Sequence, residues 1–321
     1  MKRIRMLLFL LLTLGSIIGM PSRAAQPEKK IGVLFWNAAP RYVDAKNGIV
    51  DQLKKEGFAE PTVQFFMVNA DGNKAKAVEA VHTFTVEKLD MIISLGTSAT
   101  LAVTRDVKDV PVVFSSVFDP VASKIAKSWE SSDNNTTGAS NRVPLSMTLS
   151  RLKEFAPVKT LAVLYTANEL NSVVQLKELQ GLQADFQIRI IPVPLTAAED
   201  VPQVLPEVMR GADALYLSGS SVVDKAATTI VDMATKARVI TITHIDDLLD
   251  KGVLLGVCAD SYAVGRLTGE KAAMVLRGAK PSSIPIGHLE KLEMTINLRT
   301  MKAGGFQPSP SFMKSVTKSI E

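Results

Sequence analysis

Polar side chains follow several short apolar runs of the chain, and these are the residues whose chemistry could form a binding site. Thr97 and Ser98 come after the run 91–95, and His244 follows the run 240–243. In open α/β sheets, ligands bind beyond the carboxyl ends of the strands, where loops and helix N-termini converge. If these runs are strands, their ends would line a cleft rich in hydrogen-bonding groups, which suits a small polar ligand.

The candidate ligand-binding residues combine hydroxyl, amide, carboxylate, imidazole and aromatic side chains. They are Trp36, Asn37, Thr97, Ser98, Ser116, Phe118, Asp119, Asn141, Glu169, Asn171, Ser220, Ser221, His244 and Asp260. A helix N-terminus that carries hydroxyl groups, as expected at Thr97 and Ser98, favours a carboxylate or another anion. A carboxylate such as that of Asp119 could instead pair with a ligand ammonium group.

Each of these residues also has a structural interpretation, which the sequence leaves open. Polar side chains at such positions commonly cap the next helix, as Ser98, Glu169 and Asn171 could do. Asp119 precedes a proline and could close a turn on its own backbone. Trp36 could stack with Tyr42 on a planar ligand, or it could simply end a core strand.

Residue patterns typical of enzymes are missing from the sequence. It contains no G-x-S-x-G elbow, no P-loop lysine and no dinucleotide-binding glycine pattern after a strand. The three histidines lack metal-ligand spacing. Cys258 is the only cysteine, which excludes an intramolecular disulfide and a two-cysteine racemase. We therefore expect a protein that is not an enzyme and that uses no cofactor or metal.

Apolar runs alternate with helical patterns along the first half of the chain. The expected strands are 31–36, 62–68, 91–95 and 112–117, and the expected helices are 44–58, 75–88 and 99–107. This alternation is typical of a parallel sheet that is covered by helices on both faces.

The second half of the chain repeats the first. Residues 161–165 correspond to 31–35, residues 212–221 to 89–98, and residues 240–244 to 112–116. The spacing is too large for a solenoid repeat. The sequence therefore predicts an α/β fold of two Rossmann-like lobes with parallel sheets.

The order of the expected strands also predicts how the lobes are connected. The first lobe would comprise 25–143 and 260–289, and the second 144–259 and 290–321. The chain would then cross between the lobes three times, and such a three-segment hinge permits the lobes to close on a ligand.

The first 24 residues have the pattern of a signal peptide. A basic start is followed by an apolar run over 6–20, which is short for a membrane-spanning helix. Small residues then offer a cleavage site near Ala24 or Ala25. No cysteine follows the run, so a lipid anchor is not expected. These features predict an exported, periplasmic protein.

The positive charge of the chain comes largely from that leader. Four of its basic residues lie among the first 24, where no acidic residue occurs, so the net charge falls from +5 to +1 without them. No long run of lysine or arginine remains to follow a phosphate backbone. Nucleic acid is therefore not an expected partner.

Five short motifs in order resemble those of the ABC transporter substrate-binding proteins, which have the type I periplasmic binding protein fold. The motifs are LGTSA at 95–99, PVVFSSVFDP at 111–120, NTTG at 135–138, NELNS at 168–172 and INL at 296–298. The resemblance extends over 30–305, and the better-known members of the subfamily bind aromatic amino acids.

The resemblance implies a receptor that captures a small solute, favouring an amino acid or a derivative, between two closing lobes. Its partners would be that ligand and an ABC permease of the inner membrane with its ATPase subunits, and the receptor would act as a monomer. The alternative is a ligand-binding accessory of a membrane sensor.

Two departures from the family pattern concern the ligand. Ala39 replaces the histidine of a His-Pro pair, and Gly219 and Ser220 replace an Asp-Asn pair. The missing carboxylate weakens the inference of a site for an amino-acid ammonium group.

Overall fold

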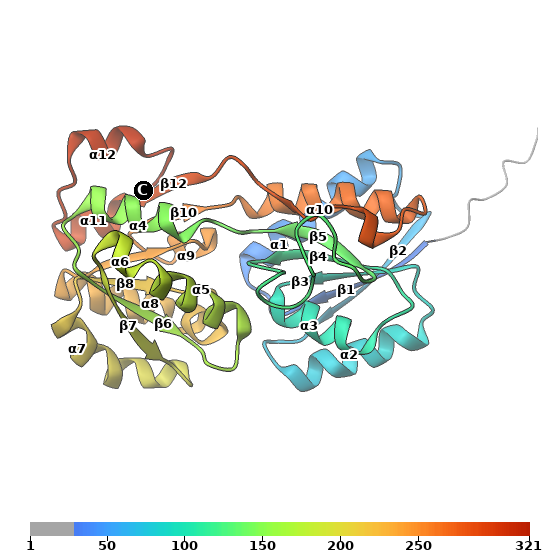
Figure 1. Ribbon diagram of the computed structural model, residues 1–321, viewed down its shortest axis with the longest axis horizontal. Coiled ribbons are helices and arrows are strands. Elements are labelled where there is room, and N and C mark those ends of the chain that lie inside the picture. Colours follow the sequence, from blue (N-terminus) through green and yellow to red (C-terminus); the bar gives the residue numbers. More distant parts are fainter. Residues whose placement is uncertain (1–28) are drawn as a thin grey trace, which may run out of the picture.

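The computed structural model describes residues 29–321 and consists of two α/β lobes that lie side by side (Figure 1). The predicted signal peptide and its cleavage site lie outside the described residues. Each lobe is built around its own sheet. Among the helices of residues 29–321, none combines the length and apolar character that crossing a bilayer requires.

The sheet of the first lobe is parallel throughout, in the order β11-β5-β4-β3-β1-β2. Its strands are β1 (Lys29–Phe35), β2 (Val63–Asn69), β3 (Met91–Leu95), β4 (Val112–Val117), β5 (Thr136–Ser140) and β11 (Gly287–His288). Its helices are α1 (Pro40–Lys55), α2 (Lys74–Val86), α3 (Thr97–Asp106) and α10 (Ser261–Leu276), with a short 3-10 turn at Pro281–Ser283. Helices α1 and α10 cover one face of the sheet, and α2 and α3 cover the other (Figure 1).

The sheet of the second lobe has the order β13-β12-β10-β9-β8-β6-β7. Its strands are β6 (Thr160–Tyr165), β7 (Arg189–Pro194), β8 (Ala214–Leu217), β9 (Ile240–Thr243), β10 (Leu255–Cys258), β12 (Glu293–Asn297) and β13 (Lys318–Ile320). Its helices are α4 (Leu145–Phe155), α5 (Leu170–Gly181), α6 (Gln183–Phe186), α7 (Val201–Gly211), α8 (Ser221–Ala237), α9 (Asp246–Asp250), α11 (Leu298–Gly304) and α12 (Pro310–Ser315), with a 3-10 turn at Ala198–Asp200.

One part of the second sheet departs from the predicted parallel arrangement. Strand β12 pairs antiparallel with β10, and β13 follows the direction of β12. The chain reaches β12 from β11 of the first sheet. It therefore enters the second lobe near the carboxyl ends of β6, β8, β9 and β10. Strand β12 must therefore run in the opposite direction.

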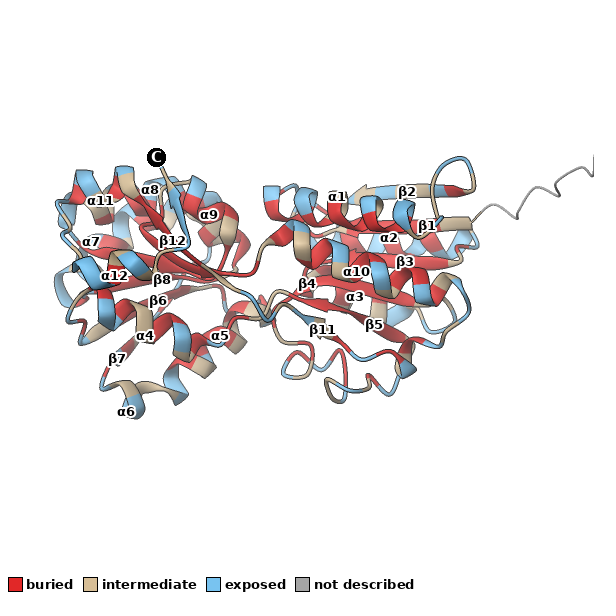
Figure 2. Ribbon diagram, turned by 90° about the horizontal axis from the view of Figure 1, so that it is seen from above, coloured by how far each residue is buried: buried red, intermediate tan, exposed pale blue. Residues whose placement is uncertain are grey.

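Strands that were predicted from continuous apolar runs are deeply buried between the helices (Figure 2). Every residue of β3 and β4 is buried, and both strands have the predicted bounds. Burying one large apolar side chain contributes about 1.5–3 kcal/mol, so these runs fix the sheet between its helices. The helices start earlier than predicted, because Pro40 suits the first turn of α1 and Gly96 adopts a φ of 96° before α3.

The predicted internal repeat is visible in two matching aspartates at the sheet edges opposite the site. Asp90 accepts a hydrogen bond from the backbone N–H of Lys30 at 2.9 Å, at the start of β1. Asp213 accepts the equivalent bond from Thr160 at 2.9 Å, at the start of β6. In each lobe, an equivalent hydrogen bond therefore connects the loop before β3 or β8 to the first strand of that lobe.

Helices α1 and α10 pack closely because glycines face the partner backbone. A Cβ atom added at Gly48 would overlap the carbonyl oxygen of Tyr262, and one added at Gly265 would overlap that of Ala45. This contact attaches α10, which follows β10 of the second sheet, to the first lobe.

The substitution Gly265→Ala tests this packing. We expect it to lower the free energy of unfolding by about 1–3 kcal/mol, because the helices must move apart. Gly181→Ala is the matched control, because an added Cβ there meets nothing within 4 Å, and it should change stability by about 1 kcal/mol or less. Urea unfolding of both variants provides the measurement, and equal effects would contradict the close contact.

Candidate functional site: a polar cavity between the lobes

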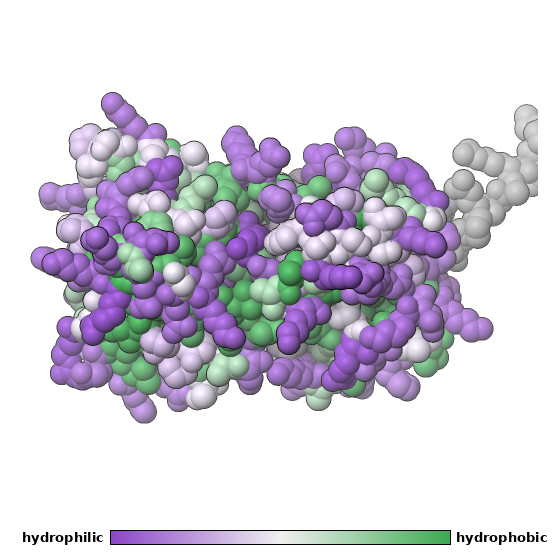
Figure 3. All heavy atoms as spheres, viewed as in Figure 1, coloured by the Kyte–Doolittle hydropathy of each residue, from purple (hydrophilic) through white to green (hydrophobic). Residues whose placement is uncertain are grey.

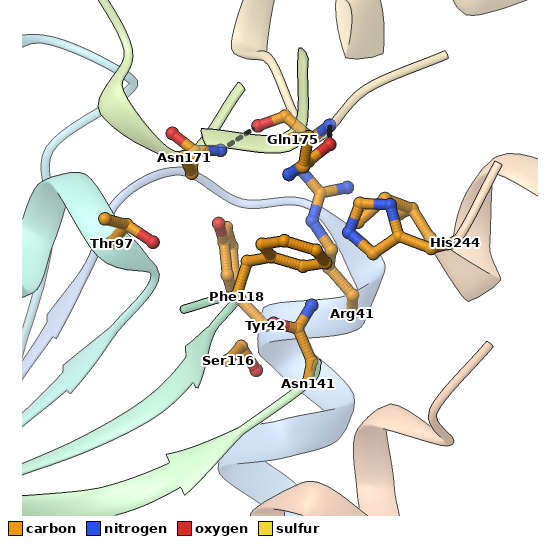
Figure 4. Close-up of a pocket in the computed structure, with 11 residues that line it drawn as sticks. Arg41, Tyr42, Thr97, Ser116, Phe118, Asn141, Asn171, Gln175 and His244 are labelled. Atoms are coloured by element: carbon orange, nitrogen blue, oxygen red, sulfur yellow. Dashed lines mark hydrogen bonds between the residues drawn. The ribbon is translucent and has the colours of Figure 1, made fainter. Parts of the chain in front are cut away.

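A small cavity lies where the carboxyl ends of the two sheets face each other (Figure 4). The first lobe and its exit segment contribute Arg41, Tyr42, Thr97, Ser116, Phe118 and Asn141, and the second lobe contributes Asn171, Gln175, Gly219, His244 and Ile245. The cavity volume is about 20 Å³, which holds one or two water molecules. A larger solute therefore enters only if the lobes part or side chains move.

Local backbone geometry brings the first-lobe residues to the cavity. Gly96 turns the chain from β3 into α3, so Thr97 is the first residue of the helix and faces the site. Ser116 has a φ of 57°, a left-handed conformation that interrupts the pairing of β4 with β5. Such strain in a non-glycine residue is common at functional sites.

Three buried polar atoms of the cavity lack a hydrogen-bond partner within residues 29–321. They are Ser116 Oγ, Asn141 Oδ1 and His244 Nε2. A buried polar group without a partner costs about 1–3 kcal/mol. The atoms come from both lobes and line the same cavity, so a solute that bonded to them would recover this cost on binding.

His244 is held as a neutral imidazole. Its Nδ1 atom shares a hydrogen bond of 2.6 Å with the hydroxyl of Tyr216. Its ring makes a T-shaped contact with the ring of Phe118, and the two ring centroids are 4.8 Å apart. Burial, together with the positive charge of Arg41, lowers the pKa of His244 to about 3. The free Nε2 atom can accept or donate a hydrogen bond, depending on the tautomer.

Arg41 joins the two lobes through a buried ion pair. Its side chain extends from α1 toward His244 and Gln175 (Figure 4), and Nη1 contacts Asp247 at 3.0 Å and Asp224 at 2.9 Å. Burial alone would lower the pKa of Arg41, but the two carboxylates raise it well above its ordinary value. The guanidinium is therefore permanently charged inside the interface.

Two further hydrogen bonds cross between the lobes. The indole N–H of Trp36 donates to Ser221 Oγ at 2.7 Å, and Lys74 Nζ donates to the carbonyl of Asn168 at 3.1 Å. Apolar residues gather where the lobes meet on the face seen in Figure 3. The lobes are therefore in direct contact around the cavity.

Six of the candidate residues line the cavity. They are Thr97, Ser116, Phe118, Asn141, Asn171 and His244. Trp36 and Ser98 line a separate groove between α2, α3 and the start of α5. Ser221 bonds to Trp36, and the side chain of Asn37 accepts a hydrogen bond from the backbone of Ala39.

Four candidates have structural roles and do not line the cavity. Asp119 has the turn-closing role that was its alternative interpretation, whereas the side chain of Glu169 does not cap the helix that follows it. Asp119 accepts hydrogen bonds from the backbone of 121 and 122 and pairs with Arg142 at 2.5 Å. Ser220 caps α8 and Asp260 caps α10. Glu169 accepts the backbone N–H of the first residue of α8 at 3.0 Å, and burial raises its pKa.

Three residues that line the cavity were not predicted from the sequence, namely Arg41, Gln175 and Ile245. Arg41 was missed because the first helix was predicted to begin at residue 44, which left 41 in a loop. Gln175 lies one turn after Asn171 on α5, so helical spacing could have indicated it. No comparable pattern indicates Ile245.

The pKa of His244 predicts how stability depends on pH. The pKa of His244 in the folded protein lies below its ordinary value of 6.5. The contribution of His244 to the free energy of unfolding is therefore fully present above pH 6.5 and is lost as the pH falls toward about 3. Imidazole nitrogen shifts should show His244 neutral at about pH 5. The unfolding free energy of the wild type should fall relative to His244→Gln over the same range. Protonation near the ordinary pKa would contradict the buried, neutral assignment.

Comparison with known proteins finds relatives over most of the chain. A tyrosine-binding protein of Clostridioides difficile (strain R20291) is 24% identical over 281 residues, which cover 87% of this chain and 81% of that protein. The crystal structure of an ABC domain in complex with L-Trp, from Streptococcus pneumonia, aligns with a TM-score of 0.87 at 23% identity, covering 91% of this chain and 100% of that one. A ligand-free, open substrate-binding protein from Clostridium difficile gives 0.71 at 25% identity, covering 91% and 100%.

These similarities confirm the predicted fold of two α/β lobes. The family described as ABC transporter substrate binding protein matches residues 30–320. Its members bind a solute and are not enzymes, which confirms the expectation drawn from the missing catalytic motifs. This chain belongs to the ABC transporter substrate-binding protein family.

Proposed function

We propose that the protein is the extracytoplasmic receptor of an ABC importer and captures an amino acid or a derivative in the cavity between its lobes. The observation that carries this proposal is the set of unpartnered buried atoms on Ser116, Asn141 and His244. They come from both lobes and line one cavity. A solute that satisfied them would contact both lobes at once.

Both the lining and the relatives support an amino acid or a derivative. Phe118 and Tyr42 offer aromatic surface next to hydroxyl and amide groups, a mixture that suits a small solute with a planar or apolar part. The relatives named above include a tyrosine-binding protein and a domain in complex with L-Trp.

Closure of the lobes would couple binding to a change of shape. We infer lobes of 25–143 with 260–289 and of 144–259 with 290–321, which hinge where the chain passes between the sheets. The higher TM-score to the L-Trp complex than to the open protein supports a closed arrangement here. A ligand shifts such an equilibrium only through contacts that are better in the closed state, as contacts to both lobes would be.

The leader pattern supports export to the periplasm, with cleavage near Ala24 or Ala25 and no lipid anchor. The mature receptor would act as a monomer. Its closed form would deliver the solute to an inner-membrane permease, whose ATPase subunits would drive transport.

A thermal-shift screen of residues 25–321 tests the proposal. The panel contains amino acids, amino-acid derivatives, sugars, nucleosides and organic acids. A ligand at 100 times its Kd stabilises the folded state by about 2.7 kcal/mol, so a bound amino acid should raise the Tm by several degrees. Stabilisation by sugars or nucleosides alone would contradict the proposed solute class.

Variants from each lobe test whether the solute binds between them. Asn141→Ala removes a group contributed from the end of the first sheet, and Asn171→Ala removes one from the second lobe. Each should weaken binding of the solute at least tenfold, or about 1.4 kcal/mol, in calorimetric titrations. Gln180→Ala is the control, because this residue is on α5 but exposed. Sensitivity to only one lobe would contradict capture between the two.

A further inference from the structure

The charges around the cavity are unevenly distributed. Arg41 is the one charged side chain among the described residues that line it, and none of those residues carries a carboxylate. A solute that binds here therefore meets one cation and a set of neutral polar groups. Such a lining favours a solute with a negatively charged group over one with a positively charged group.

The carboxylates near the cavity already have partners. Asp224 and Asp247 pair with Arg41, and Asp224 also contacts Lys251 at 3.1 Å. Glu169 accepts the backbone N–H at the start of α8. An ammonium group in the cavity would thus find neutral acceptors but no carboxylate to compensate its charge.

The carboxylates contact only one nitrogen of the Arg41 guanidinium, which lies over the ring of Tyr42 at 4.9 Å from its centroid. Within the described part of the chain, all its side-chain hydrogen bonds to Asp224 and Asp247 are donated by Nη1. Nη2 and Nε donate none of these bonds, although the residue lines the cavity. A guanidinium binds a carboxylate through two parallel N–H groups, and Nη2 with Nε forms such a pair.

The surrounding backbone also favours an anion. Thr97 is the first residue of α3, and Asn171 is in the first turn of α5. Both line the cavity, so the positive ends of two helices face it. Ser116, whose Oγ has no partner, is 7% exposed and adds an O–H donor.

We propose that the cavity selects its solute by a carboxylate held on Nη2 and Nε of Arg41, and that the solute needs no ammonium group. This inference rests on the proposed function and narrows it. The preferred solutes are carboxylic acids as a class, and amino acids bind through their carboxylate. The free groups of Ser116, Asn141 and His244 would then bond to other polar atoms of the solute.

Matched triplets of solutes test the proposal on the wild-type protein. Each triplet contains an L-amino acid, the acid that lacks its amino group and the amine that lacks its carboxylate, on tyrosine, tryptophan, leucine and serine scaffolds. Calorimetric titration should show that, on at least one scaffold, the deaminated acid binds within tenfold of the amino acid, and that the amine of that scaffold does not bind.

The other outcomes overturn the inference in distinguishable ways. If amino acids bind but their deaminated acids do not, the ammonium group is required and the inference fails, while the proposed function stands. Binding of the amines would overturn it as well. If no member of any triplet binds, both the inference and the proposed amino-acid receptor fail.

A pair of variants tests the role of Arg41 without leaving unpaired carboxylates. Asp247→Asn keeps the guanidinium, and the double variant Arg41→Gln with Asp247→Asn removes it, while Asp224 keeps its contact with Lys251. The double variant should bind the acid at least tenfold more weakly than the single variant, because both lack the Asp247 carboxylate and only the double variant lacks the guanidinium. Equal affinities would overturn the assignment of Arg41. Circular dichroism verifies that both variants are folded, and the triplet experiment decides the solute class in either case.

Discussion

The guanidinium of Arg41 makes the buried ion pairs that join the two lobes. It extends from the first helix of one lobe to two carboxylates of the other, and it is only 5% exposed. A buried charge without partners is strongly unfavourable, and removing one partner of such a pair typically costs about 3–5 kcal/mol. If the lobes close as we propose, the ion pair would form only as they approach, and closure would then neutralise the charges of the interface.

The same contact explains why the cavity is small. With Arg41 drawn toward Asp224 and Asp247, the space between the sheets is about 20 Å³. An incoming solute must compete with these contacts or separate the lobes first. Hydrogen bonds from the solute to the unpartnered atoms of Ser116, Asn141 and His244 would offset the loss of these contacts, because the three atoms are otherwise buried without partners.

The fold could be predicted from the sequence because its signals are local and repeated. Continuous apolar runs gave the bounds of β3 and β4, and the match of Asp90 with Asp213 reflects one hydrogen-bonding device used twice. The antiparallel β12 was not predicted, since its direction follows from where the chain re-enters the second lobe.

The site was harder to predict, because a residue that follows the end of a strand can bond either to a ligand or to the nearby backbone. Thr97 and Asn171 line the cavity as expected, whereas Asp119 and Asp260 bond to their own backbones. Arg41 was missed because its importance depends on two aspartates of the other lobe, about 200 residues away in the sequence. Such long-range charge pairing leaves no local pattern.

The most direct test of the account is a crystal structure of residues 25–321 with the solute that gives the largest thermal shift. We predict that the solute lies in the cavity lined by Phe118 and His244 and contacts residues of both lobes, including at least two of Ser116, Asn141 and His244. A solute bound on one lobe alone, or in the groove beside Trp36 while this cavity keeps its contacts, would contradict it.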